Sequence, residues 1–72
     1  MVAQLIMKPM WNGEKIKALR VHMGLTQTQF AEALGYGRYQ TVLEFERGRR
    51  EIPETTARLL DCLAEKHQFE ER

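Results

Sequence analysis

Apolar residues recur at three- and four-residue steps along most of this chain, and capping residues, glycines and a proline divide the pattern into four helical segments. The first helix is predicted to begin after Asn12, a good N-cap with Trp11 just before it and Glu14 in the first turn. It is predicted to end at Gly24. Its inward positions are Ile16, Leu19 and Met23.

The second predicted helix opens with Thr26 followed three residues later by Gln29, which is the pattern of a capping box. This helix is predicted to close at Gly35. Its inward positions are Phe30, Ala31 and Leu34. The Gly-Tyr-Gly stretch at 35–37 is difficult to accommodate in a helix and therefore predicts a turn.

The third helix is predicted from about Arg38 to Arg47, and it stops at Gly48. Pro53 marks the start of a fourth helix, because proline is tolerated in a first turn. The inward positions of the third helix are Val42 and Phe45, and those of the fourth are Ala57, Leu59, Leu60, Leu63 and Ala64.

These segments predict an all-α fold, a small bundle of four to five helices joined by short loops. We expect a single domain over residues 1–72, with an N-terminal arm at 1–11, a helical core at 12–66 and a C-terminal tail at 67–72. Residues 1–9 carry scattered apolar side chains that fit an arm, a short strand, a dimer contact or a frayed terminus.

Length and composition narrow the classes of function. Seventy-two residues, of which 43% are apolar, describe one small folded domain with too little core for a deep active site. A lone cysteine forms no internal disulfide, so packing or oligomerisation must stabilise the fold. No apolar run approaches the roughly 20 residues of a membrane span, and the first residues lack the pattern of a signal peptide. We therefore expect a cytoplasmic protein without a membrane partner.

The formal charge of +1 conceals an uneven distribution. Residues 1–50 hold eight basic and four acidic side chains, whereas residues 51–72 hold three basic and six acidic ones. The junction carries a basic cluster, Arg47, Arg49 and Arg50, which is either solvated surface or a contact for an anionic partner. Because a partner meets only one face, the near-neutral total does not argue against nucleic acid.

Side chains suited to catalysis or metal binding are few: Cys62, His22 and His67. Cys62 is expected to be a small buried residue beside Leu59 and Leu63 rather than a nucleophile. Its five-residue separation from His67 does not match the common ligand spacings of zinc sites, and neither a glycine-rich phosphate loop nor a pair of catalytic carboxylates is present. We expect no enzyme activity, no cofactor and no metal.

The middle of the chain meets the steric requirements of a helix-turn-helix. Ala31 is a small residue where the third helix must cross the second, and Gly35, four positions later, tolerates a positive φ in the turn. Val42 and Phe45, three residues apart, supply the apolar anchors of the third helix.

The runs at 13–20, 24–27, 30–35, 41–42 and 45–50 extend this pattern, above all the Thr-Gln that opens the second helix and the Phe-Glu-Arg-Gly that ends the third. Over residues 12–65 the sequence resembles the Cro and phage-repressor (XRE) type of helix-turn-helix protein. The resemblance implies a lambda-repressor-like DNA-binding domain.

In this family the third helix enters the major groove of DNA. By family position, the residues implied to read bases are Arg38, Tyr39, Gln40 and Glu44. The residues implied to contact the DNA backbone are Thr26, Gln27, Thr41, Arg47, Arg49 and Arg50. Arg20 and Glu46 are implied to form a structural ion pair that ties the first helix to the end of the third.

Two departures from the family pattern bear on the interface. Counted from Gly35, the apolar anchors of the third helix fall one residue later than is usual, so the turn holds an extra residue. Leu43 and Glu44 stand where small polar or basic residues are commoner. Glu44 would repel phosphates unless it meets a cytosine or a neighbouring arginine, and otherwise it is a solvated residue with no reading role. Leu43 fits a thymine methyl group or a partner interface.

The sequence therefore predicts a sequence-specific DNA-binding transcriptional regulator, a homodimeric repressor that binds an inverted-repeat operator in double-stranded DNA. By analogy with Cro-like repressors, anti-CRISPR-associated autoregulators and antitoxins, it would control its own operon in a bacterial or phage-infected cell. The candidate dimer or core residues are Leu59, Leu60 and Leu63. The alternative is an antitoxin, or another protein-interaction module, that binds a partner such as a toxin through the acidic C-terminal helix. The two functions can coexist, because antitoxins often also bind their own operators.

Overall fold

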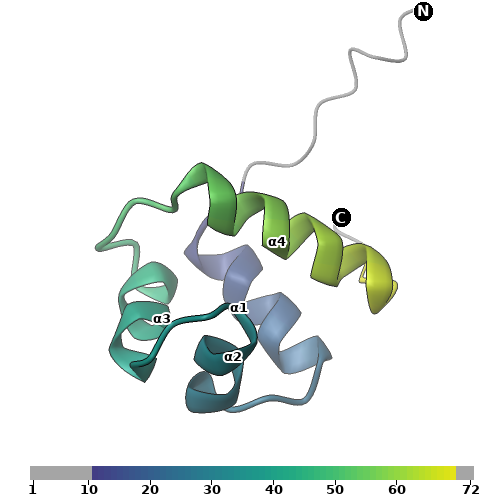
Figure 1. The fold of residues 1–72 in the computed structure, drawn as a ribbon, viewed down its shortest axis with the longest axis horizontal. Helices are drawn as coiled ribbons and strands as arrows, with labels where there is room; N and C mark the ends of the chain where they lie inside the picture. Colours follow the sequence, from purple (N-terminus) through teal and green to yellow (C-terminus); the bar gives the residue numbers. More distant parts are fainter. Residues whose placement is uncertain (1–10, 70–72) are drawn as a thin grey trace, which may run out of the picture.

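Four α-helices form where the capping residues and the apolar pattern predict them. The computed structural model describes residues 11–69, and it contains no strand in that range. The helices are α1 (Gly13–His22), α2 (Gln27–Ala33), α3 (Tyr39–Glu46) and α4 (Glu54–Lys66) (Figure 1). The all-α prediction is confirmed for this part of the chain, whereas the hypotheses about residues 1–9 lie outside the described residues.

Side-chain caps define the starts of the first two helices. The Asn12 side chain accepts a hydrogen bond from the backbone N–H of Lys15 at 2.9 Å. In the predicted capping box, the Thr26 side chain accepts from the backbone of Gln29, whose own side chain accepts from the Thr26 backbone. These bonds satisfy amides that a helix start leaves without partners, so both predicted N-caps are confirmed.

The turn between α2 and α3 depends on Gly35. Its φ of +85° lies in the left-handed region, where a side chain would introduce strain. Around it, the backbone N–H of Tyr36 donates to Ala31 O at 2.8 Å and that of Gly35 donates to Glu32 O at 3.0 Å. These two bonds terminate α2 and release the chain toward α3 in a new direction.

Each helix contributes predicted inward residues to one core, although Ala57 of α4 is only partly buried and is not among them. The buried cluster consists of Ile16, Leu19, Phe30, Ala31, Leu34, Val42, Phe45 and Leu60. Partly buried Leu59, Leu63 and Ala64 pack against this cluster, as does Met23. Burial of this apolar surface is the main stabilising contribution that the helices share.

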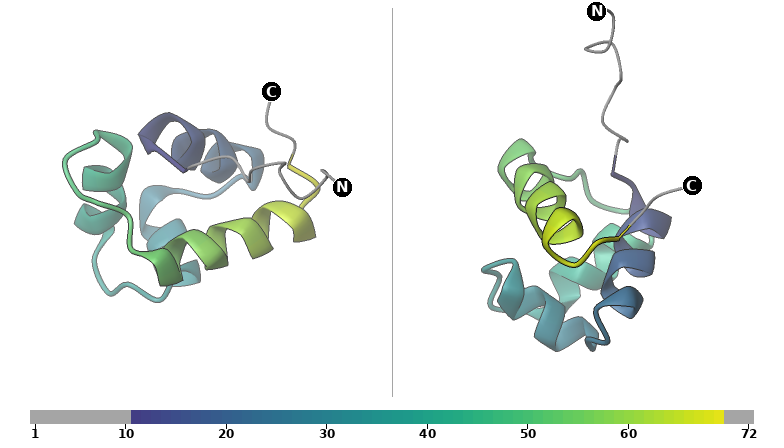
Figure 2. Two further views of the ribbon diagram at one scale, coloured as in Figure 1. Left: turned by 90° about the horizontal axis from the view of Figure 1, so that it is seen from above. Right: turned by 90° about the vertical axis from the view of Figure 1, so that its right-hand side faces the viewer.

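The helices surround this core in an arrangement that separates α4 from α3. In Figure 1, α4 runs along one side of the molecule, and α2 and α3 occupy the other. The two views of Figure 2 place α1 and α4 on different sides of the interior. The outer surface of α3 is therefore left uncovered by α4.

The prediction that Cys62 is buried is wrong, because its side chain is exposed. Leu60 is the fully buried apolar residue of α4, and two residues further along a helix is about 200° around its axis. Cys62 therefore faces away from the core although apolar residues flank it in the sequence.

Candidate nucleic-acid interface

The position of α3 is set first by a close backbone contact with the start of α1. A Cβ atom on Gly13 would lie 2.7 Å from the carbonyl oxygen of Phe45 and closer still to that of Glu46. Real side chains do not tolerate such distances to backbone atoms, so only glycine allows α1 to begin against the end of α3. Sequence reasoning did not recognise this role, although the residue lies inside the run that carries the family resemblance.

A carboxylate at the end of α3 joins that helix to α1. Arg20 Nε donates to Glu46 Oε2 at 2.7 Å, and its Nη2 donates to Glu46 Oε1 at 3.3 Å. The guanidinium also donates from Nη1 to Leu25 O at 3.1 Å. Only 14% of the Arg20 side chain and 6% of the Glu46 side chain are exposed, so the two charges are compensated away from water.

The same carboxylate also holds Gln27, the first residue of α2. Gln27 Nε2 donates to Glu46 Oε1 at 3.1 Å. Glu46 therefore receives hydrogen bonds from α1 and α2 while belonging to α3. This network fixes the start of α2 beside the end of α3, which are the two elements that the resemblance places on DNA.

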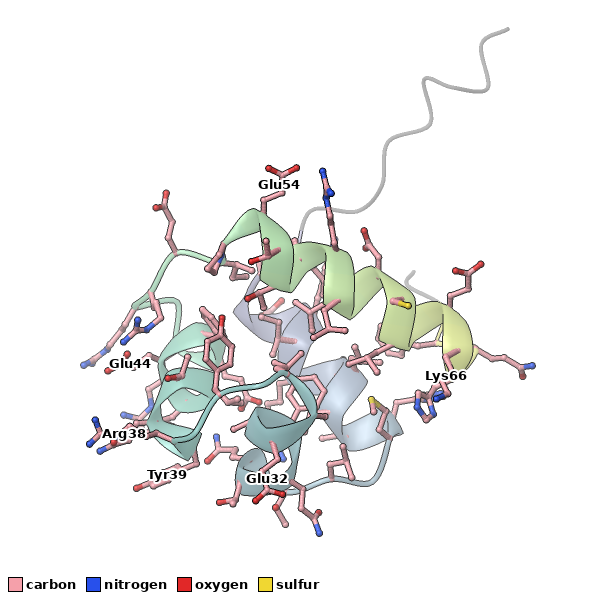
Figure 3. The ribbon with its side chains drawn as sticks, in the orientation of Figure 1. Glu32, Arg38, Tyr39, Glu44, Glu54 and Lys66 are labelled. Carbon is pink, nitrogen blue, oxygen red and sulfur yellow. The ribbon has the colours of Figure 1, made fainter. Side chains whose placement is uncertain are left out.

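The N-terminal part of α3 projects polar side chains outward. Arg38 is the N-cap of α3 but makes no side-chain capping bond, and Tyr39 is 48% exposed. Gln40 is also exposed, whereas Thr41 is half-buried. Figure 3 shows Arg38 and Tyr39 pointing away from the body of the molecule, on the side opposite α4.

These outward side chains are not engaged within the domain. In the described part of the chain, no hydrogen bond or ion pair occupies the side chains of Arg38, Tyr39 and Gln40. Arginine and glutamine can each bond bidentately to a purine edge in the major groove. Unpaired donors at the N-terminus of an exposed helix are therefore available for base contacts.

The loop after α3 extends this surface with basic side chains. The backbone N–H of Arg49 donates to Glu44 O at 2.8 Å, and Gly48 has a φ of +72°, so the chain turns back against α3. Arg47 and Arg49 are exposed. Arg50 is exposed as well, but it pairs with Glu44 at 2.7 Å. The loop places cations beside α3, and side chains of this kind commonly bind phosphates in protein–DNA complexes.

Two contacts that connect other parts of the domain to α4 were not predicted. The Tyr36 hydroxyl shares a hydrogen bond with Thr56 Oγ1, and the Tyr36 ring lies edge-on to Phe45 with 5.8 Å between centroids. Trp11 Nε1 donates to Asp61 Oδ1 at 2.8 Å. The first contact connects the turn before α3 to α4, and the second connects the start of α1 to α4.

Other kinds of site find little support among residues 11–69. No group of three or more histidine, cysteine, aspartate or glutamate side chains in this range is arranged to hold a metal ion. Nor does any helix in the same range have the length and apolar character to cross a membrane.

The paired helices α2 and α3, joined by a glycine turn and followed by a basic loop, define a helix-turn-helix of the kind that presents its second helix to DNA. The family model described as Helix-turn-helix matches residues 16–63, two-thirds of the chain. The chain belongs to this XRE-type helix-turn-helix family of DNA-binding regulators. Comparison with curated proteins and with solved structures gives no significant match.

Proposed function

We propose that this protein is a homodimeric transcriptional repressor that binds an inverted-repeat operator and inserts α3 into the major groove. The observation that carries the proposal is the set of exposed, unpaired side chains at the start of α3, beside the exposed arginines of the following loop. Neither set has a role in the core, and together they combine groups that recognise bases with groups that bind phosphates.

Each group has a distinct role in this proposal. Arg38, Tyr39 and Gln40 read base edges, because they project from the N-terminal end of the recognition helix. The residues that hold the DNA backbone are Thr26, Gln27, Thr41, Arg47, Arg49 and Arg50. Gln27 is suited to this role because its bond to Glu46 orients the side chain at the start of α2. Arg20 and Glu46 keep the two helices in register without touching DNA.

The test uses the DNA upstream of the coding sequence. A labelled fragment of this region is titrated with protein in a gel-shift assay, with competition from the same fragment unlabelled or from unrelated DNA of equal length. We expect the unlabelled specific fragment to displace the labelled one at a concentration at least ten times lower than unrelated DNA requires. Equal competition by both DNAs would refute sequence-specific regulation.

We further propose that α4 supplies the dimer interface. Leu59 and Leu63 are only partly covered by the core, and α4 lies on the side away from α3, which leaves both recognition helices of a dimer free for DNA. A two-fold dimer then matches two half-sites about one DNA turn apart. Such a protein acts where the operator lies, in the cytoplasm of a bacterial or phage-infected cell.

Sedimentation equilibrium tests this interface. Cys62→Arg adds a charge to the exposed surface of α4 without disturbing the core and is expected to weaken the dimer. Val21→Arg, at a 61% exposed apolar residue of α1, is the matched control and should leave the dimer unchanged. Loss of the dimer in Val21→Arg alone would place the interface on α1 instead.

A further inference from the structure

We propose that Glu44 restrains sequence-independent DNA binding by holding the guanidinium of Arg50 as a DNA phosphate would. Arg50 then offers the Nε–Nη2 edge of its guanidinium to DNA only when this ion pair opens. The inference rests on the proposed function, because it assigns a regulatory role to a residue of the same interface. It replaces the expectation that Glu44 reads a base.

The Arg50–Glu44 ion pair has the geometry of an arginine–phosphate contact. Arg50 Nε donates to Glu44 Oε1 at 2.8 Å, and Arg50 Nη2 lies 2.7 Å from the same oxygen. Two guanidinium nitrogens thus converge on one carboxylate oxygen, the side-on arrangement that arginine also uses for a phosphate oxygen. The carboxylate occupies the Nε–Nη2 edge of the guanidinium, one of the two edges with which arginine can hold a phosphate.

Glu44 lies on the exposed side of α3. Val42 and Phe45 define the buried side of the helix, and Glu44 lies one turn after Gln40 on the exposed side. A negative charge there faces the same DNA as the reading residues. The other acid of α3, Glu46, is almost fully buried and neutralised by Arg20, so it adds no comparable repulsion.

Both side chains of the Arg50–Glu44 pair are open to water. The side chains of Arg50 and Glu44 are 51% and 42% exposed, in contrast to the buried Arg20–Glu46 pair. An ion pair so open to water contributes little to folding stability and is easily exchanged. Its main effect is therefore on the binding of other groups at this surface, because a DNA phosphate must displace Glu44 to bind the same edge of Arg50.

The magnitude follows from counterion release. Each phosphate contact steepens the slope of log affinity against log salt concentration by about 0.9. Freeing Arg50 should add one such contact per subunit. The ratio of affinities at 50 mM and 200 mM salt then rises by about 3.5-fold per subunit. The gain applies to any DNA sequence, so discrimination between operator and unrelated DNA falls.

Glu44→Gln tests the proposal by fluorescence anisotropy on the operator fragment and on an unrelated duplex, each titrated across this salt range. The matched control is Glu54→Gln, which changes the net charge equally and breaks the exposed Arg58–Glu54 pair on α4. Figure 3 shows Glu54 at the top of the molecule on α4 and Glu44 at its left edge on α3. A third variant, Glu44→Gln with Arg50→Gln, removes the arginine that the substitution frees.

Glu44→Gln is expected to bind the unrelated duplex more tightly and with a steeper salt slope than the wild type. Glu54→Gln should not steepen the slope, and the double variant should return to the wild-type slope or below. Weaker operator binding by Glu44→Gln with unchanged affinity for unrelated DNA would show a base-reading role and overturn the proposal. Equal slopes for Glu44→Gln and Glu54→Gln would overturn it too.

The same titrations distinguish failure of this proposal from failure of the proposed function. If the wild type binds both duplexes equally, sequence-specific regulation is refuted. The effect of Glu44 on the unrelated duplex is still measured in that case, and its sign decides the present proposal.

Discussion

Replacing Glu46 with glutamine removes the charge that holds α1 and α2 against the end of α3. The amide keeps the size of the side chain and one acceptor oxygen. The variant loses the negative charge and one of the two acceptor oxygens: either Oε2, which accepts from Arg20 Nε at 2.7 Å, or Oε1, which accepts from Arg20 Nη2 and Gln27 Nε2. Arg20, only 14% exposed, is left with an uncompensated charge.

The expected cost is large for a domain of this size. Breaking one partner of a buried ion pair typically costs about 3–5 kcal/mol, and we take the lower value, about 3 kcal/mol, because an acceptor remains. The total stability of such a domain is about 4–11 kcal/mol. A loss of 3 kcal/mol corresponds to a Tm lowered by about 12–24 °C.

Thermal unfolding followed by circular dichroism measures this change, and operator binding is measured well below the new Tm. Glu54→Gln serves as the control. Glu54 and its partner Arg58 are more than three-quarters exposed, and the pair joins residues four apart in one helix, so it connects no two helices. The Tm of this control should stay close to that of the wild type. A Glu46→Gln variant that melts within 3 °C of the wild type, or that loses operator affinity with unchanged stability, would refute the structural role assigned to Glu46.

Three further substitutions separate packing from recognition. Gly13→Ala should destabilise the fold by about 1–3 kcal/mol in urea unfolding, because its Cβ meets backbone carbonyls, whereas Gly37→Ala, with open space around it, should cost far less. Gln40→Ala should relax base choice at one operator position by about 1–3 kcal/mol in a competition series of operator variants. Arg49→Ala should weaken all DNA sequences alike and flatten the salt slope by about 0.9 per subunit. If Gln40→Ala and Arg49→Ala behave identically, the division into base-reading and phosphate-binding residues is wrong.

Local signals made most of the helical architecture predictable. The capping box at Thr26 and Gln29 and the N-cap at Asn12 act over three residues, so a single sequence contains all the information they need. The period of the apolar residues likewise locates the core, because a helix repeats its faces every few residues. Cys62 shows the limit, since apolar neighbours in sequence do not share its side of the helix.

Contacts between distant segments were beyond such reasoning. Tyr36 and Thr56 are separated by 20 residues and Trp11 and Asp61 by 50, and no local pattern links either pair. The Arg20–Glu46 contact was anticipated only through the family resemblance, because nothing in the spacing itself pairs these charges. The role of Gly13 could not be predicted either, because the carbonyl groups that exclude a side chain there belong to residues distant in the sequence.

The side chains of Arg38, Tyr39 and Gln40 take no part in the hydrogen bonds and ion pairs that hold the described residues together. Substitutions among them therefore leave intact the carboxylate network, the glycine contact and the core that position α3. If these residues read bases as proposed, the preferred DNA sequence can change by single mutations in a lineage without loss of the folded state. Grafting another trio of outward residues onto this scaffold would redirect it to a different DNA target.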